Sequence, residues 1–163
     1  MLYTKNSTLF NLDKARLSNK VYIVEGYADA FTLYKHGIDN VVDLCGLSFM
    51  DTKYKLLVQN AIKEIVFCLD NDEAGVKALN RIIDKELRSL AGIDVSVKIF
   101  PADCIHKDVD EYIVAEGIEA FKELPERTVF EFKLDKLKKD KSDVIIKNDI
   151  IQLIVDEADH TVK

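Results

Sequence analysis

Three groups of acidic residues could carry chemistry in this sequence, because each follows an apolar run of strand length. The groups and their runs are Glu25 after residues 21–24, Asp70 and Asp72 after residues 65–69, and Asp108 and Asp110 beyond residues 95–100. In an open parallel sheet, ligands bind beyond the carboxyl ends of the strands, so acids there carry more functional weight than acids elsewhere. Gly26 and Gly75 would remove side chains where the backbone must turn or a phosphate must approach.

The Asp70–Asp72 pair has two interpretations. An apolar strand that runs directly into Asp-x-Asp places two hard oxygen ligands on one side of a turn, an arrangement suited to Mg²⁺. Alternatively, the turn is solvated, Asp72 caps the following helix, and Glu73 lies favourably at the positive end of that helix. From this pair alone the two interpretations are equally supported.

Two rival motifs share parts of this pattern. A calcium loop of the EF-hand kind fails, because its fifth and twelfth places hold Ala74 and Arg81. A haloacid-dehalogenase-like phosphatase also has an aspartate pair after an apolar strand, but the chain departs from that family's pattern at Glu73 and Ala74. The phosphatase remains an alternative.

Apolar runs and helix-length segments alternate along the chain. We expect strands at 21–24, 41–44, 65–69 and 95–100, and helices at 28–36, 52–62 and 74–90. Strands that are apolar on both faces and separated by helices predict an α/β fold with about four parallel strands, flanked by helices. After Pro125 the pattern predicts only helices, which we interpret as a C-terminal helical appendage.

Composition limits the classes of function. The chain has 163 residues, 48% hydrophobic and 32% charged, which is typical of one ordered domain with a small appendage. It has no apolar run of the roughly 20 residues that a membrane span needs, so we expect a soluble cytoplasmic protein and no membrane partner. The net charge of −6 means that any contact with nucleic acid must be local. Three widely spaced cysteines are expected to be thiols in a reducing compartment.

Taken together, the motifs resemble the Toprim domain of bacterial replicative primases of the DnaG type. The matching segments are Glu25-Gly26-Tyr27-x-Asp29, residues 37–42, Asp70-x-Asp72-x-Ala74-Gly75 and residues 107–112. The chain departs from the family at Val109, where Pro is usual, and at residues 47–49. The resemblance divides the chain into the end of an upstream subdomain (1–20), the Toprim domain (21–125) and the start of a helical bundle (126–163).

This resemblance implies a metal-dependent RNA polymerase that makes short primers from ribonucleotides on a single-stranded DNA template. It implies Glu25 and Asp70 as catalytic residues. It also implies a Mg²⁺ site, which Mn²⁺ could occupy, formed by Glu25, Asp70 and Asp72, with a second, weaker position at Asp108 and Asp110. Divalent ions held by carboxylates suit nucleotidyl transfer, because negative charge builds on the phosphate. Asp29 could as well be a charge at the start of a helix.

The family resemblance also places several functions outside this chain. Zinc belongs to a domain upstream, and the replicative helicase binds through a domain downstream. Lys5, Lys14, Arg16 and Lys77 are weak candidates for nucleotide or template contact, and by itself the chain is expected to make little primer. A basic run at residues 133–141 is interpreted as a solvated helix face. A stand-alone Toprim protein, either a small nuclease or an inactive scaffold, is the alternative.

Overall fold

The computed structural model describes residues 8–45, 51–86, 92–140 and 152–154. Their centre is a five-stranded sheet in the order β2-β1-β3-β4-β5. Four strands are parallel, namely β1 (Lys20–Val24), β2 (Val41–Asp43), β3 (Glu64–Phe67) and β4 (Asp94–Lys98). The fifth, β5 (Glu126–Thr128), runs antiparallel to β4.

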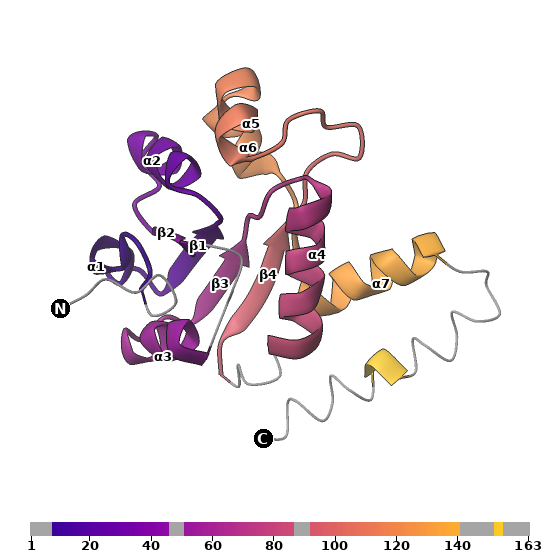
Figure 1. The fold of residues 1–163 in the computed structure, drawn as a ribbon, viewed down its shortest axis with the longest axis horizontal. Coiled ribbons are helices and arrows are strands. Elements are labelled where there is room, and N and C mark those ends of the chain that lie inside the picture. Colours follow the sequence, from indigo (N-terminus) through magenta and orange to yellow (C-terminus); the bar gives the residue numbers. More distant parts are fainter. Residues whose placement is uncertain (1–7, 46–50, 87–91, 141–151, 155–163) are drawn as a thin grey trace.

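Helices cover both faces of this sheet (Figure 1). One face packs against α1 (Leu12–Ala15), α3 (Asp51–Gln59), α4 (Glu73–Arg81) with its π-helical continuation η2 (Ile82–Glu86), and α7 (Val129–Asp140). The other face packs against α2 (Tyr27–Lys35), α5 (Val109–Glu116) and α6 (Ile118–Glu123). Because strand side chains alternate between faces, neighbouring residues such as Ile23 and Val24 enter different cores.

The predicted α/β architecture is confirmed: four parallel strands and the helices between them lie within a few residues of the expected positions. The helix predicted over residues 74–90 begins as α4 and changes to π-helical geometry at Ile82, and residues 87–90 lie outside the described residues. Of the predicted last helix, residues 152–154 are helical, and the rest also lies outside the described residues.

The expectation of helices alone after Pro125 was wrong. Glu126, Arg127 and Thr128 form β5, in which Arg127 pairs with Val97 of β4, before α7 begins at Val129. The boundary proposed after Pro125 therefore separates this strand from the sheet to which it is hydrogen-bonded. The strand has no apolar alternation, since all three of its side chains are polar, so its sequence carries no strand signal.

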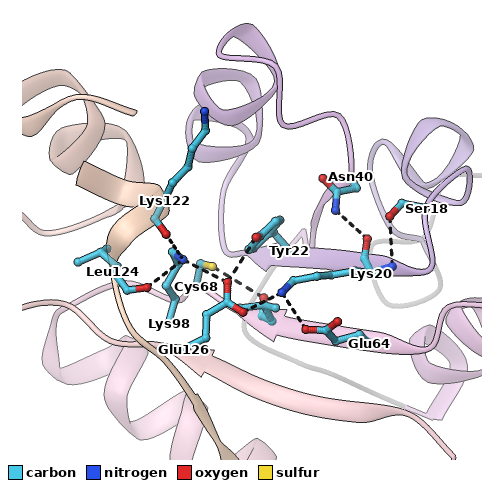
Figure 2. Close-up of polar contacts among 11 residues, drawn as sticks. Ser18, Lys20, Tyr22, Asn40, Glu64, Cys68, Lys98, Lys122, Leu124 and Glu126 are labelled. Atoms are coloured by element: carbon cyan, nitrogen blue, oxygen red, sulfur yellow. Dashed lines mark hydrogen bonds and ion pairs between the residues drawn. The ribbon is translucent and has the colours of Figure 1, made fainter. Parts of the chain in front are cut away.

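Ion pairs and hydrogen bonds attach β5 to the sheet (Figure 2). Glu126 accepts hydrogen bonds from Lys20 at 2.7 Å, from Lys98 at 3.2 Å and from the Tyr22 hydroxyl at 3.3 Å. The Lys98 side chain is only 2% exposed, and its ammonium also donates to the carbonyl of Leu124. Burial of a lysine is costly unless its charge is paired, so Glu126 provides the counter-charge that lets Lys98 lie inside the fold.

Candidate active site at the carboxyl ends of β1 and β3

The chain turns from β1 into α2 through Glu25 and Gly26. Val24, the last residue of β1, is fully buried, and Gly26 has an extended backbone as the N-cap of α2. This short turn leaves Glu25 at the carboxyl end of a central strand. Asp29 follows within the first turn of α2, is only 5% exposed, and accepts a hydrogen bond of 3.0 Å from the backbone N–H of Asp110.

Asp70 lies beside Glu25. The neighbouring strand β3 ends at Phe67, and the chain continues through buried Cys68 and Leu69 to Asp70. The backbone N–H of Asp70 donates to Oε1 of Glu25 at 3.1 Å. Glu25 and Asp70 therefore lie at the carboxyl ends of the neighbouring parallel strands β1 and β3.

Gly75 allows this close approach. A Cβ atom at that position would lie 2.2 Å from the carbonyl oxygen of Asp70 and 2.9 Å from Oε1 of Glu25. No side chain fits there unless the backbone moves. The N–H of Gly75 also donates to Oδ1 of Asp72 at 2.8 Å, so Asp72 is the N-cap of α4. The capping interpretation of Asp72 is therefore confirmed, while Oδ2 of Asp72 faces Lys107.

The third acidic group arrives on α5. Asp108 is the N-cap of that helix and accepts a hydrogen bond of 2.8 Å from the N–H of Glu111. The Asp110 carboxylate accepts a hydrogen bond from the hydroxyl of Thr32 on α2. Of the two residues assigned to a second metal position, Asp108 interacts electrostatically with Asp70 and Asp29, whereas Asp110 lies at the contact between α2 and α5.

Burial and mutual repulsion control the ionisation of these acids. Burial and, second to it, the negative charge of Asp70 together raise the pKa of Glu25 to about 7. Burial likewise raises the pKa of Asp29 to about 6, with contributions from Asp108 and Asp70. The pKa of Asp70 is also raised by burial, although Lys107 opposes this effect. A raised carboxyl pKa beside other acids is typical of a site that holds cations or transfers protons.

Lys107 supplies positive charge next to these acids. Its ammonium lies 3.5 Å from Oδ2 of Asp70 and 3.8 Å from Oδ2 of Asp72. Asn71 fixes the loop that carries Lys107, because its side-chain amide donates to the carbonyls of Cys104 and His106 at 3.3 Å each. The site therefore contains its own cation beside the aspartate pair.

Sequence reasoning left Asp29 unassigned and overlooked Lys107. Asp29 belongs to the Glu25-Gly26-Tyr27-x-Asp29 motif, and this was the available signal. Lys107 begins the matching segment 107–112, but its proximity to the aspartates could not be predicted, because it depends on the packing of its loop against residues 70–72. Both residues belong to the candidate site by position.

The weak candidates for nucleotide or template contact lie on or directly after α1, on α4, or outside the described residues. Lys14 lines a shallow hollow with Ser18, Asp39 and other residues of the segment that precedes β2, near the amino ends of the strands. Arg16 donates to the backbone carbonyl of Asp13. Lys77 forms an exposed ion pair with Glu73 on α4, and Lys5 lies outside the described residues.

The basic face of α7 contacts the protein's own acids and amides. Lys133 pairs with Asp84 at 3.8 Å, and Lys136 donates to Oδ1 of Asn80 at 2.9 Å. This arrangement agrees with a solvated helix face.

Within the described ranges, no helix is long and apolar enough to cross a membrane.

The acids fit a divalent cation by their chemistry. Carboxylate oxygens are the ligands that Mg²⁺ and Mn²⁺ prefer, and burial together with neighbouring acids raises the pKa values of Glu25 and Asp29, so a bound cation would favour their ionised forms. In their present rotamers, the His, Cys, Asp and Glu side chains of the described residues do not form a group of three or more that could hold a metal ion. The ammonium of Lys107 contacts Oδ2 of Asp70 and Oδ2 of Asp72.

Comparison with known proteins finds primases. The chain is 36% identical over 141 residues to the DNA primase of Enterococcus faecalis, an alignment that covers 82% of this chain and 22% of that protein. A solved DNA primase domain from Pseudomonas aeruginosa is 29% identical with a TM-score of 0.71, and the match covers 83% of this chain and 43% of that one. The catalytic domain of a DnaG primase bound to single-stranded DNA is 25% identical with a TM-score of 0.70, covering 86% and 45%.

The chain thus spans about a fifth of the length of its curated primase relative. The family model described as Toprim-like matches residues 22–113, a range that contains Glu25, Asp29, Asp70, Asp72, Lys107, Asp108 and Asp110. That match covers more than half of the chain and agrees with the fold of the solved primase domains. The chain therefore belongs to the Toprim-like family.

Proposed function

We propose that this chain is the Toprim-like catalytic part of a DNA primase, which makes short RNA primers on single-stranded DNA by metal-dependent nucleotidyl transfer. The observation that carries the proposal is the direct contact of Glu25 and Asp70 at the carboxyl ends of β1 and β3. Its relatives are named DNA primases, and one solved catalytic domain binds single-stranded DNA. A single-stranded DNA template is proposed on the same basis, and ribonucleotides and a helicase partner are proposed from the resemblance to replicative primases.

In this proposal Glu25, Asp70 and Asp72 hold Mg²⁺, for which Mn²⁺ could substitute, and Asp108 with Asp110 forms a second, weaker position. A bound divalent ion would supply positive charge to the phosphate that undergoes attack. Asp29 interacts electrostatically with Asp70 and Asp108, so it would add negative charge to the same site.

The chain's own residues have separate roles in this reaction. In the metal-free site, where its pKa is about 7, Glu25 can accept or release a proton near neutral pH, and a bound divalent ion would favour its carboxylate form. The backbone N–H of Asp70 donates to Glu25, so the Glu25 carboxylate is held beside the start of the turn that carries Asp70. Gly75 leaves the space between α4 and the two acids without a side chain.

The first test compares the wild-type chain with Asp70→Asn by thermal unfolding, in chelator and in excess Mn²⁺. An ion that binds only the folded state should raise the melting temperature with its concentration. Asp70→Asn should remove most of that increase while leaving the metal-free protein nearly as stable. Asp84→Asn is the matched control, because its exposed ion pair with Lys133 contributes little.

The second test measures primer synthesis. Residues 22–113 would replace the equivalent segment of the Enterococcus faecalis primase, and synthesis from ribonucleotides would be measured on single-stranded DNA. We expect activity from the chimera, none from its Asp70→Asn form, and little from the 163-residue chain alone. A folded chimera without synthesis, or a chain that only cleaves DNA, would contradict the primase assignment and favour the nuclease alternative.

A further inference from the structure

We propose that Lys107 is a resident counter-cation of the Asp70–Asp72 pair, which a divalent ion displaces when it binds. This inference rests on the proposed function, because it assumes that these acids hold a metal ion. Its basis is geometric: the Lys107 ammonium lies 3.5 Å from Oδ2 of Asp70 and 3.8 Å from Oδ2 of Asp72. The ammonium and a divalent ion would compete for the same two oxygen atoms.

The acids need a cation even in the absence of metal. The Asp70 side chain is only 17% exposed, so water solvates it incompletely. Its surroundings add negative charge, since Glu25 touches its backbone and Asp108 and Asp72 act on it electrostatically. A positive charge at Lys107 therefore lowers the repulsion within the folded, metal-free site.

The backbone of Lys107 is held on both sides. Its carbonyl accepts a hydrogen bond of 2.6 Å from the N–H of Asn71, and its N–H donates to Oε2 of Glu111 at 2.8 Å. The first bond joins the Lys107 loop directly to the turn between Asp70 and Asp72. The root of the side chain is thus fixed beside the metal-binding turn.

The Lys107 side chain, by contrast, is 55% exposed, and its contacts with both aspartates are long for ion pairs. Exposed lysine pairs of this kind are weak, and the four-carbon stem of lysine has many accessible rotamers. A doubly charged ion would therefore displace the ammonium at little cost. Because the backbone stays fixed, the displaced ammonium remains beside the site and available to an anionic substrate.

Competition between the Lys107 ammonium and the metal ion predicts that removing the charge of Lys107 increases the affinity for the metal. Lys107→Met keeps a side chain of similar length without its charge, so Mn²⁺ should bind roughly two- to tenfold more tightly than to the wild type. The same variant should melt at a lower temperature in chelator, and this deficit should close in saturating Mn²⁺. Lys107→Arg, which restores the charge, should return both quantities toward wild-type values.

The experiment uses the 163-residue chain, with Mn²⁺ affinity measured by electron paramagnetic resonance and stability by thermal unfolding. Lys122→Met is the matched control, because it removes the same charge from an exposed lysine whose ion-pair partner is Glu119 on α6. The control should leave Mn²⁺ affinity unchanged. Tighter Mn²⁺ binding in Lys107→Met alone supports the proposal.

Other outcomes would overturn it. If Lys107→Met binds Mn²⁺ equally or less tightly than the wild type, or if its stability deficit persists in saturating Mn²⁺, Lys107 has a purely structural role. In that case the proposed function still stands, provided that Asp70→Asn abolishes Mn²⁺ binding. If the wild-type chain does not bind Mn²⁺, or if Asp70→Asn still binds it, the metal site and the counter-cation are both wrong.

Discussion

At the scale of single residues, Gly75 is the position in the site with no room for a side chain. A Cβ atom there would overlap the carbonyl oxygen of Asp70 at 2.2 Å, so Gly75→Ala must displace backbone or Glu25. We expect the variant to lose about 1–3 kcal/mol of unfolding free energy, as overpacked sites do, together with the Mn²⁺-induced increase in melting temperature. Urea unfolding and thermal unfolding with Mn²⁺ would measure the two effects.

The direction in which Gly75→Ala changes the free energy of unfolding is informative by itself. Alanine in place of glycine within an unhindered helical turn stabilises a protein by roughly 0.5–1 kcal/mol. A more stable Gly75→Ala variant would therefore show that α4 lies farther from Asp70 than the structure places it.

The acids also show how far single residues could be assigned from sequence. Glu25 and Asp70 were predictable, because each directly follows an apolar strand and adjacent parallel strands bring such positions together. The capping role of Asp72 is seen in the structure, since one of its oxygens caps α4, while its role as a metal ligand stays a prediction. Asp29 and Lys107 were not predictable to the same degree, because their roles depend on burial and on packing between distant segments.

At the scale of secondary-structure elements, the attachment of β5 depends on Glu126. Burial alone would raise the pKa of Glu126, but hydrogen bonds from Lys20 and the charge of Lys98 outweigh it and lower that pKa below 4.5. An acid whose pKa is lowered by folding adds stability above its unfolded pKa, and loses that contribution as the pH falls through the folded value. Glu126→Gln should therefore cost roughly 1–3 kcal/mol at neutral pH and progressively less in acid.

Urea unfolding of wild type and Glu126→Gln at several pH values would measure this difference. Glu119→Gln is the control, because Glu119 forms an exposed ion pair with Lys122 on α6 and should show little change at any pH. A cost for Glu126→Gln that is the same at neutral pH and well below pH 4.5 would mean that shape, not charge, holds β5.

Elements with strong apolar patterns were predictable from sequence, and those formed by pairing were not. The runs at β1, β2, β3 and β4 indicated the parallel strands, since residues such as Val21 and Ile65 are buried in the sheet. The strand β5 has only polar residues and forms through its pairing with β4 and its ion pairs with Lys20 and Lys98. Such long-range contacts leave no local periodicity in a sequence.

At the scale of the whole molecule, the sheet and the segment after Pro125 form one folding unit. A chain that ends at Pro125 would leave Lys98 buried without its carboxylate and would remove Val129 and Phe132 from the core. Removing one partner of a buried ion pair costs about 3–5 kcal/mol, which is much of the roughly 5–15 kcal/mol that stabilises a typical domain. We therefore expect the chain that ends at Pro125 to be largely unfolded at physiological temperature.

Circular dichroism during urea unfolding would test this expectation, with a chain ending at Asp140 as the control. The longer chain retains β5 and α7 and should unfold cooperatively, near the midpoint of the 163-residue chain. Equal midpoints for the chains ending at Pro125 and at Asp140 would contradict the single folding unit.

The two edges of the sheet have a consequence for behaviour at high concentration. Both edge strands, β2 and β5, are three residues long; β2 is partly covered by the bridge from Phe10 to Asp43, and β5 carries Glu126 and Arg127. Long, flat, apolar edges recruit strands from other molecules, whereas short and charged edges do not. The described sheet therefore offers little template for intermolecular β-pairing, and amyloid-like aggregation through its edges should require prior unfolding.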